Sequence, residues 1–528
     1  MTTVSVNQSM ASQNGHPPSL FILFFTEMWE RFSYYGMRAL LVLFLTSSIM
    51  DGGWAWDRKD ALQLYGIYTG LVYLTPIFGG LIADKLLGYR KAVMLGALIM
   101  TIGHACMAMD TPPFFYTGLG CLIIGNGLFK PNISSIVGQL YTNTPEKKDA
   151  AYTIFYMGIN AGAFLGILLC GYIGEKISWS YGFGLAGVFM LLGLLQFSFA
   201  QKIFGAIGLT PKKKTEGGID PEAANYSNNN AFEEPNRNAQ PAIPKNVTRD
   251  RIIVISVLAF FTIFFWWAFE QAGGSMTIFA GDYTNRTLSG GSASLFKWAN
   301  TLLTVIPMII LTVVLANLFR KTFSKYALSN IFLGSSFVII WGIVIWMLIR
   351  EFKADATEVP ASWFGILNSF FIIALAPVFS KMWESRFNPS GPVKFAIGLI
   401  LLGLGFAILS YGGKDIPQGA KTASVSMAWL ILAYLFHTMG ELCVSPVGLS
   451  YVSKLAPVKL VGLMFGIWFI ANFIANYMAG LTGSFIDDIT TKYSISTFFL
   501  IFTFVPIAAG LVMLALNKIL KKKMHGIE

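Results

Sequence analysis

Four charged side chains lie within one apolar stretch near the start of the chain, TEMWERFSYYGMRALL (residues 26–41). Three of them, Glu27, Arg31 and Arg38, are spaced by four and seven residues. These spacings, with Tyr34 between the last two, place the side chains on one face of a helix. A single charge at the centre of a bilayer costs roughly 2.5–3.5 kcal/mol by insertion scales. Charges confined to one stripe therefore indicate a helix that lines a water-filled cavity; the alternative is an ion-pair network that only holds helices together.

Glu30 and Tyr35 flank this stripe, and further charges occur in apolar stretches later in the chain. The full set is three cations and four carboxylates, namely Arg31, Arg38 and Lys130 against Glu27, Glu30, Glu270 and Glu441. One carboxylate is in excess, and a protonated Glu is the least costly way to bury it. This imbalance favours a protein that takes up and releases protons inside the membrane.

The composition is that of an all-α, polytopic membrane protein. Of 528 residues, 55% are hydrophobic and 12% are charged, whereas soluble proteins carry about 25% charged residues. Apolar runs of bilayer-spanning length recur along the whole chain. They predict fourteen spans, near residues 20–48, 60–87, 91–109, 114–140, 149–175, 181–204, 251–281, 293–319, 326–349, 361–383, 394–412, 423–452, 459–484 and 493–520.

A polar segment divides the spans into two sets. Residues 205–249 are rich in Asn, Pro and charge and lack apolar periodicity, which is typical of a flexible linker. Six spans before a linker and a second set after it favour two bundles around a central site. The expected units are a tail at 1–19, an N-terminal bundle at 20–204, the linker at 205–249, a C-terminal bundle at 250–281 and 361–521, an inserted transmembrane hairpin at 290–352, and a tail at 522–528.

Basic residues gather in alternate loops, for example in the lysine runs 212–214 and 521–523. By the positive-inside rule these loops, the linker and both termini are expected to be cytosolic. The same distribution accounts for the net charge of +11 without a nucleic-acid partner. The expected location is the plasma membrane, most simply a bacterial inner membrane, with the lipid bilayer as the surrounding partner.

Five motifs then resemble a known family. GGLIADKLLGYRK (residues 79–91) resembles a loop motif of the major facilitator superfamily, and EMWERFSYYGMRALL (27–41) resembles the ExxER motif of the proton-coupled oligopeptide transporters. LFKPNISS (128–135), FYMGINAGAFLG (155–166) and GELCVSPVGLS (440–450) are similar to motifs of the fourth, fifth and tenth spans of that family. The resemblance implies the major facilitator fold, with two six-helix bundles plus two extra transmembrane helices.

The chain departs from the family pattern at two places. Bacterial members commonly carry the two extra helices between the sixth and seventh spans, whereas here they follow the seventh. The second span, with the sequence YGIYTGLVYLTP, lacks the histidine that animal relatives have there. Proton handling is therefore expected to depend on carboxylates.

The resemblance implies a proton-coupled symporter that imports di- and tripeptides by alternating access. Arg38 and Glu270 would pair at an extracellular gate, and Lys130 and Glu441 would pair across the cavity. The residues implied in proton coupling are Glu27, Glu30, Arg31, Glu270 and Glu441. Asp84 and Arg90, in the loop motif, would support the cytosolic gate.

A peptide is a zwitterion, and a cavity with a cationic and an anionic end suits it, because a guanidinium binds a carboxylate in bidentate fashion. We expect Arg31, Lys130 and Tyr35 at the peptide carboxylate and Glu441, Asn160 and Asn368 at the amine. The other substrate-binding residues that the resemblance implies are Tyr34, Arg38, Tyr73, Trp266, Glu270, Ser445 and Trp468. We place the family's eighth span at WFGILNSFFIIALAPVF, within the span near 361–383. Alternatives remain for some of these residues: helix–helix contact for the asparagines, aromatic packing for Trp468 and Tyr73, and Asn300 in place of Asn368 if that placement is wrong.

No nucleophile–base pair, phosphate loop or metal-ligand spacing is visible, so an enzyme is not expected, and no catalytic residue, metal or cofactor other than protons is predicted. The four cysteines are expected to be small core residues. The rival functions are transport of another small solute, such as nitrate, a drug-like compound or an amino-acid derivative, and peptide sensing without transport. A monomer is expected to suffice for function.

Overall fold

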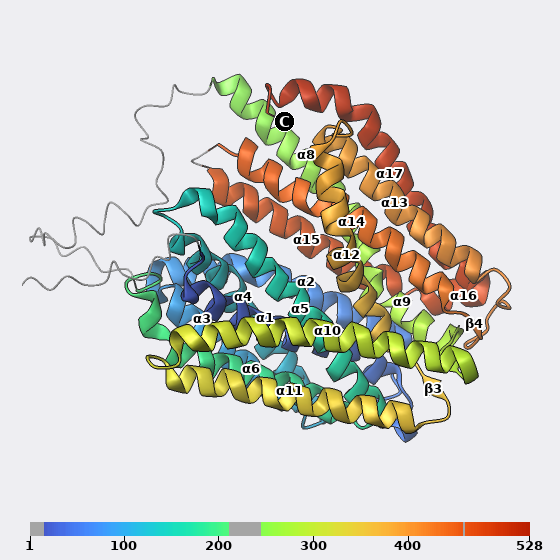
Figure 1. Ribbon diagram of the computed structural model, residues 1–528. Helices are drawn as coiled ribbons and strands as arrows, with labels where there is room; N and C mark the ends of the chain where they lie inside the picture. The colour runs from blue at the N-terminus through green and yellow to red at the C-terminus, as the bar shows by residue number, and fades with distance from the viewer. Residues whose placement is uncertain (1–14, 211–243, 458–459, 528) are drawn as a thin grey trace, which may run out of the picture.

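The computed structural model describes residues 15–210, 244–457 and 460–527, and it is built almost wholly of helices (Figure 1). Fourteen helices in these ranges have 19 residues or more. Eleven of them are long and apolar enough to cross a membrane, and α1, α3 and α4 fall outside that set. An all-α membrane protein is thus confirmed, while the count of fourteen spans stays a prediction.

The first six long helices pack against one another as an N-terminal bundle. Extensive contacts join α1 with α5, α3 with α4, and α2 with α4. Aromatic side chains fill the space between α1 and α6, where Trp29 stacks on Phe189 with ring centroids 4.9 Å apart. The bounds are α1 Pro18–Thr46, α2 Arg58–Ile82, α3 Tyr89–Met107, α4 Pro112–Leu140, α5 Lys148–Lys176 and α6 Trp179–Phe199.

A second group of helices forms the C-terminal bundle. Its closest packing joins α13 with α14 and α17, and α15 with α8. The bounds are α8 Lys245–Phe269, α12 Ile366–Glu384, α13 Gly391–Gly412, α14 Ala428–Leu455, α15 Val461–Gly483, the short α16 Ile486–Lys492 and α17 Ile495–Lys523. The linker expected at 205–249 ends earlier than predicted, since α8 already begins at Lys245. Its central part, residues 211–243, lies outside the described residues. Residues 1–14 and 528 of the expected tails also lie outside them.

The two extra helices, α10 (Gly290–Thr322) and α11 (Ala327–Lys353), form a hairpin on the outside of the N-terminal bundle (Figure 1). The Ser329 hydroxyl donates to the carbonyl of Gln196 in α6 at 2.8 Å. Phe332 stacks on Phe199 of α6 with ring centroids 5.5 Å apart. The hairpin therefore follows the seventh span in sequence yet packs against the other bundle.

The span expected at 251–281 is not one continuous helix. After α8 the chain forms a 3₁₀ turn (Glu270–Gly273), the short α9 (Ser275–Ile278) and a π-turn (Phe279–Tyr283). A Cβ added at Gly273 would lie 2.0 Å from the hydroxyl oxygen of Tyr65 in α2. Glycine at this position lets the broken helix approach α2, and Glu270 begins the break.

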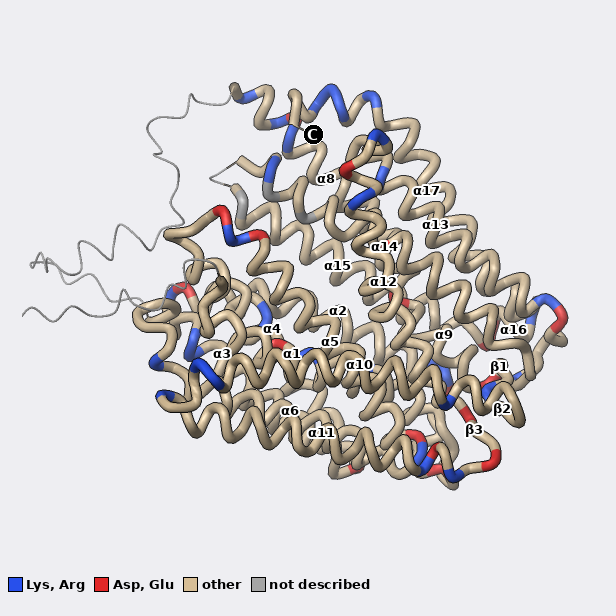
Figure 2. The backbone as a smooth tube through the Cα atoms, viewed as in Figure 1, with Lys and Arg blue, Asp and Glu red and all other residues tan. Residues whose placement is uncertain are grey.

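Charged residues gather at the two ends of the helices and are sparse between them (Figure 2). One end, which we call the terminal end, holds the start of α1 and the end of α17. The other, which we call the far end, holds two short strand pairs. Strand β1 (Thr284–Asn285) pairs in parallel with β4 (Val425–Ser426), and β2 (Thr287–Leu288) pairs antiparallel with β3 (Thr357–Glu358).

The two bundles meet tightly at the far end. Helices α2 and α15 come so close that a Cβ added at Gly66 would lie 2.6 Å from the Cα of Gly480. Beside this contact Arg58 of α2 forms ion pairs with Asp282 at 2.6 Å and with Asp487 at 2.9 Å. Both contacts cross between the bundles, so the structure is closed at the far end.

We predict that Gly66→Ala separates the bundles at the far end, because the added methyl group has no space beside Gly480 and overpacking of this kind costs about 1–3 kcal/mol. The measurement is a distance distribution between spin labels at Tyr181 and Tyr493, two exposed far-end positions on opposite bundles. Gly80→Ala on the same helix is the matched control, since nothing lies within 4 Å of a Cβ added there. Identical distributions for both variants would contradict the prediction.

Candidate functional site

The charged stripe predicted on the first span forms a compact buried group on α1. The Nε of Arg31 donates to Oε1 of Glu27 at 2.8 Å and lies 2.6 Å from Oε2 of Glu30. The three residues are 3%, 2% and 0% exposed, respectively. Glu30, expected beside the stripe, thus contacts the same guanidinium as Glu27.

A second helix completes this group. Asn126 of α4 donates its amide to Oε1 of Glu30 at 2.8 Å. In the described part of the chain, Nη2 of Arg31 and the hydroxyl of Tyr34 are buried without a hydrogen-bond partner. Because buried polar groups are normally paired, these two donors are available to an anion that enters beside α1.

Arg38 and Glu270 come together as predicted, joining α1 to the start of the break after α8. Nη2 of Arg38 contacts Oε2 of Glu270, which is 3% exposed. The Tyr65 hydroxyl of α2 accepts from Nε of Arg38 at 2.9 Å and from Nη2 at 2.6 Å. This buried pair crosses between the bundles, so opening the far end requires its separation.

Lys130 and Glu441 do not form the expected ion pair, although both lie in the described part of the chain. The ammonium of Lys130 instead lies 4.6 Å from the ring centroid of Tyr73. Glu441 accepts from the Asn368 amide at 2.8 Å. The bundle contacts described above lie at the far end.

The asparagine beside Glu441 is Asn368. Its amide also reaches the hydroxyl of Thr438 at 3.2 Å. The alternative, Asn300, lies on the hairpin helix α10, where it accepts from Thr304 at 3.4 Å. The geometry therefore favours α12 as the counterpart of the family's eighth span.

The remaining predicted site residues make local contacts. Asn160 donates to the carbonyl of Tyr156 on its own helix at 3.0 Å. Trp266 packs edge-on against Phe269 with centroids 5.1 Å apart, and a Cβ added at Gly448 would lie 2.4 Å from the ring of Trp468. The close fit of Trp468 agrees with a packing role, whereas the Asn160 bond lies within one helix and does not show the helix–helix contact that was its alternative. Tyr35 and Ser445 are half-buried on α1 and α14.

Arg90 of the loop motif acts within the N-terminal bundle. Its guanidinium donates to the carbonyls of Ile207 and Gly205 at 2.5 Å and of Gln201 at 3.1 Å. Asp84 lies in the π-turn that ends α2, next to the start of α3. Arg90 thus joins the segment after α6 to the start of α3 at the terminal end.

Sequence reasoning missed the neutral partners of the charges. Tyr65 and Asn126 contact Arg38 and Glu30, but neither belongs to the motifs that revealed those charges. The tyrosine-rich second span was the available signal for Tyr65. Partners on another helix depend on how the helices pack, and residue spacing along one helix does not predict that packing.

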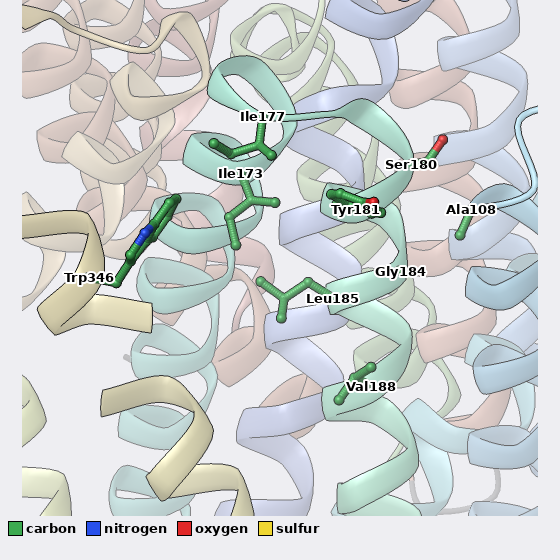
Figure 3. A pocket seen from close by; sticks show the side chains of 9 residues that line it. All are labelled: Ala108, Ile173, Ile177, Ser180, Tyr181, Gly184, Leu185, Val188 and Trp346. Atoms are coloured by element: carbon green, nitrogen blue, oxygen red, sulfur yellow. The ribbon is translucent and has the colours of Figure 1, made fainter. Parts of the chain in front are cut away.

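One surface hollow lies away from the candidate site. An apolar groove of about 550 Å³ lies on the outside between α6 and α11, and Figure 3 shows its lining, which includes Tyr181, Leu185 and Trp346. It holds none of the predicted site residues. Within the described residues no cluster of three or more His, Cys, Asp or Glu side chains is placed to hold a metal ion.

Two helical bundles that meet around paired, buried charges define a membrane transporter of the major facilitator type. The sequence profile described as the POT family matches residues 90–216 and 343–501. The chain belongs to the POT family, a family of transporters rather than enzymes, and the resemblance seen in the motifs is confirmed.

Relatives cover nearly the whole chain. The "Uncharacterized transporter YclF" of Bacillus subtilis is 33% identical, over 97% of this chain and 96% of its own. The "Di-/tripeptide transporter" of Lactococcus lactis subsp. cremoris is 29% identical, over 99% and 100%. A crystal structure of a peptide transporter POT in complex with sulfate superposes with a TM-score of 0.73 at 30% identity, covering 98% of each chain.

We predict that Tyr65→Phe lowers the stability of the closed form by about 1.5–3 kcal/mol, the usual worth of a hydrogen bond to a charged group. The readout is the apparent melting temperature of the purified protein. Tyr68→Phe is the control, because the buried Tyr68 hydroxyl has no hydrogen-bond partner among the described residues. Equal melting temperatures for the two variants would show that the Tyr65 hydroxyl does not stabilise the Arg38–Glu270 pair.

Proposed function

We propose that the protein is a proton-coupled symporter that imports di- and tripeptides by alternating access. The observation that carries the proposal is the buried Arg38–Glu270 pair, which joins the bundles at the closed far end. A proton on Glu270 would remove the charge that holds Arg38, and the far end could then open. Proton uptake and access to the site would thus be linked through one carboxylate.

The partners of the other carboxylates support proton coupling. Arg31 is shared by Glu27 and Glu30, so two carboxylates compete for one guanidinium. Glu441 has an amide rather than a cation as its partner. Each arrangement leaves a carboxylate with less than a full counter-charge, and such a group is neutralised most cheaply by a proton.

Peptide recognition would follow from the polarity of the same residues. Arg31, Lys130 and Tyr35 would hold the peptide carboxylate, and Glu441 with Asn368 would hold the ammonium group. Lys130 would leave Tyr73 and pair with Glu441 when the terminal end closes. The names of the bacterial di-/tripeptide transporters that resemble this chain support this substrate class.

We place the protein in the plasma membrane of a bacterium as a functional monomer with both termini in the cytosol. The terminal end would then face the cytosol and the far end the outside. Two rocking units, residues 20–204 and residues 250–281 with 361–521, would move about the site. Protons are the coupling ion, and no other cofactor is proposed.

The deciding experiment is uptake of a labelled dipeptide into proteoliposomes that hold the purified protein. An inward proton gradient should drive accumulation above equilibrium, and a proton ionophore should abolish it. Binding without flux would indicate a sensor instead. Gradient-driven uptake of another solute but not of dipeptides would indicate a different cargo.

We predict that Glu27→Gln abolishes proton-driven accumulation but keeps exchange of peptide across the membrane, because Arg31 would retain Glu30 while one protonatable group is lost. Counterflow and gradient-driven uptake, measured on the same vesicles, separate the two activities. Glu146→Gln, at an exposed loop position, is the control and should behave as the parent protein. Normal accumulation in Glu27→Gln would remove Glu27 from the coupling mechanism.

We predict that Arg31→Lys raises the KM for dipeptides about tenfold, which corresponds to about 1.4 kcal/mol, because an ammonium cannot bind a carboxylate in bidentate fashion. The concentration dependence of uptake gives the KM directly. Arg320→Lys, an exposed position at the terminal end of α10, serves as the control. An unchanged KM in Arg31→Lys would mean that the peptide carboxylate binds elsewhere.

A further inference from the structure

A second acid joins the two bundles at the far end. Glu175, one residue before the end of α5, is half-buried. Its Oε2 accepts from the backbone N–H of Ala361 at 2.7 Å, and its Oε1 accepts from the N–H of Ser362 at 2.9 Å and from the Ser362 hydroxyl at 2.5 Å. One carboxylate of the N-terminal bundle thus caps the first turn of a helix of the C-terminal bundle.

The capped turn is the start of a long helix. The 3₁₀ turn Ala361–Gly365 continues directly into α12, and together they form one membrane-length segment. The free N–H groups at such an end carry a partial positive charge, which a carboxylate stabilises. In the described part of the chain no Lys or Arg forms an ion pair with Glu175.

Helix α5 and the start of α12 fit closely around the cap. The indole N–H of Trp363 donates to the carbonyl of Leu168 in α5 at 2.9 Å. A Cβ added at Gly171 would lie 2.3 Å from the Ser362 hydroxyl oxygen. The contact between α5 and α12 is therefore a second place where the two bundles meet closely at the far end. It involves different helices from the contact between α2 and α15.

The charged groups around the cap already have partners of their own. Lys176 and Arg286 contact Glu358 at 2.6 and 3.1 Å, and the Tyr172 hydroxyl donates to Glu351 at 2.7 Å. Arg350 lies near the ring of Tyr172, 6.0 Å from its centroid. Among the described residues, Glu175 has hydrogen bonds from neutral donors only, as does Glu351, and the charge of Arg286 acts on Glu175 without a direct contact. Of these two acids, Glu175 is the one whose donors belong to the other bundle.

We propose that Glu175 is a proton-binding latch of the far end: its ionised carboxylate holds α12 against α5, and a proton that arrives from the far side releases it. A protonated acid carries an O–H that would face the N–H donors, so the cap loses acceptors as well as charge. This role rests on the proposed alternating-access function. Opening of the far end would then require neutralisation of Glu175 as well as separation of Arg38 from Glu270.

The neighbouring Glu358 cannot supply the same response. Burial opposes its ionisation, but the hydrogen bond from Lys176 and the charge of Arg286 hold the pKa of Glu358 below its usual value. A lowered pKa means that the ion pair stays intact in mild acid and is lost only when the pH falls through that lowered value. Glu358→Gln is therefore the matched control for the removal of a carboxylate from this region.

The experiment measures the far-end distance between spin labels at Tyr181 and Tyr493, with the four native cysteines replaced by alanine, from pH 8 to pH 5 in lipid nanodiscs. We expect acid to increase the open fraction of the parent protein. Glu175→Gln should raise the ratio of open to closed molecules at pH 8 by roughly tenfold and weaken its dependence on pH, with the remaining dependence due to Glu270. Ser362→Ala, which removes one of the three donors, should give a smaller rise and keep the pH dependence, and Glu358→Gln should also keep it.

An unchanged distance distribution in Glu175→Gln at pH 8, or a pH dependence equal to that of the parent, would overturn the proposal. Glu175→Asp keeps the charge but shortens the reach, so it should loosen the closed form and retain the pH response; it tests the latch even if Glu175→Gln does not fold. The labels report opening without any peptide. Failure of dipeptide uptake together with a positive label result would therefore reject the proposed function and leave the latch standing.

Discussion

The need to neutralise buried charge governs this structure. Arg31 lies between two carboxylates on its own helix, and Arg38 reaches Glu270 across the bundle interface. A lone charge at these depths would cost several kcal/mol, so each cation restricts where its partners can go. The Arg31 group is satisfied largely within α1 and α4 and can persist while the bundles move, whereas the Arg38 pair can exist only while they touch.

The same constraint explains why the two ends of the molecule differ. At the far end, ion pairs of Arg38 and Arg58, the Glu175 cap and the glycine contact of α2 with α15 act together. Lys130 and Glu441, which we propose pair when the terminal end closes, form no ion pair here, and each has a neutral partner: the ring of Tyr73 for the lysine and an amide for the acid. Neutral partners of this kind lower the free-energy cost of a charge that has no counter-ion.

Much of this could be read from the sequence, because the relevant patterns are local. Hydropathy located the long helices, and the spacing of Glu27, Arg31 and Arg38 placed them on one face of α1. The Arg38–Glu270 contact came from the family motifs. What the sequence did not show depends on the close approach of distant segments: the break at Gly273, where Tyr65 excludes a side chain; the capping of α12 by Glu175; and the docking of the hairpin on α6. None of these has a periodic signature in either partner.

The position of the hairpin has a mechanical consequence. Because α10 and α11 lie on the N-terminal bundle while their neighbours in sequence belong to the C-terminal one, the chain crosses the bundle interface twice at the far end, through residues 284–289 and 354–360. A seven-residue connection reaches about 25 Å when fully extended. These crossings are tethers of fixed length, and they set an upper limit on how far the far end can open.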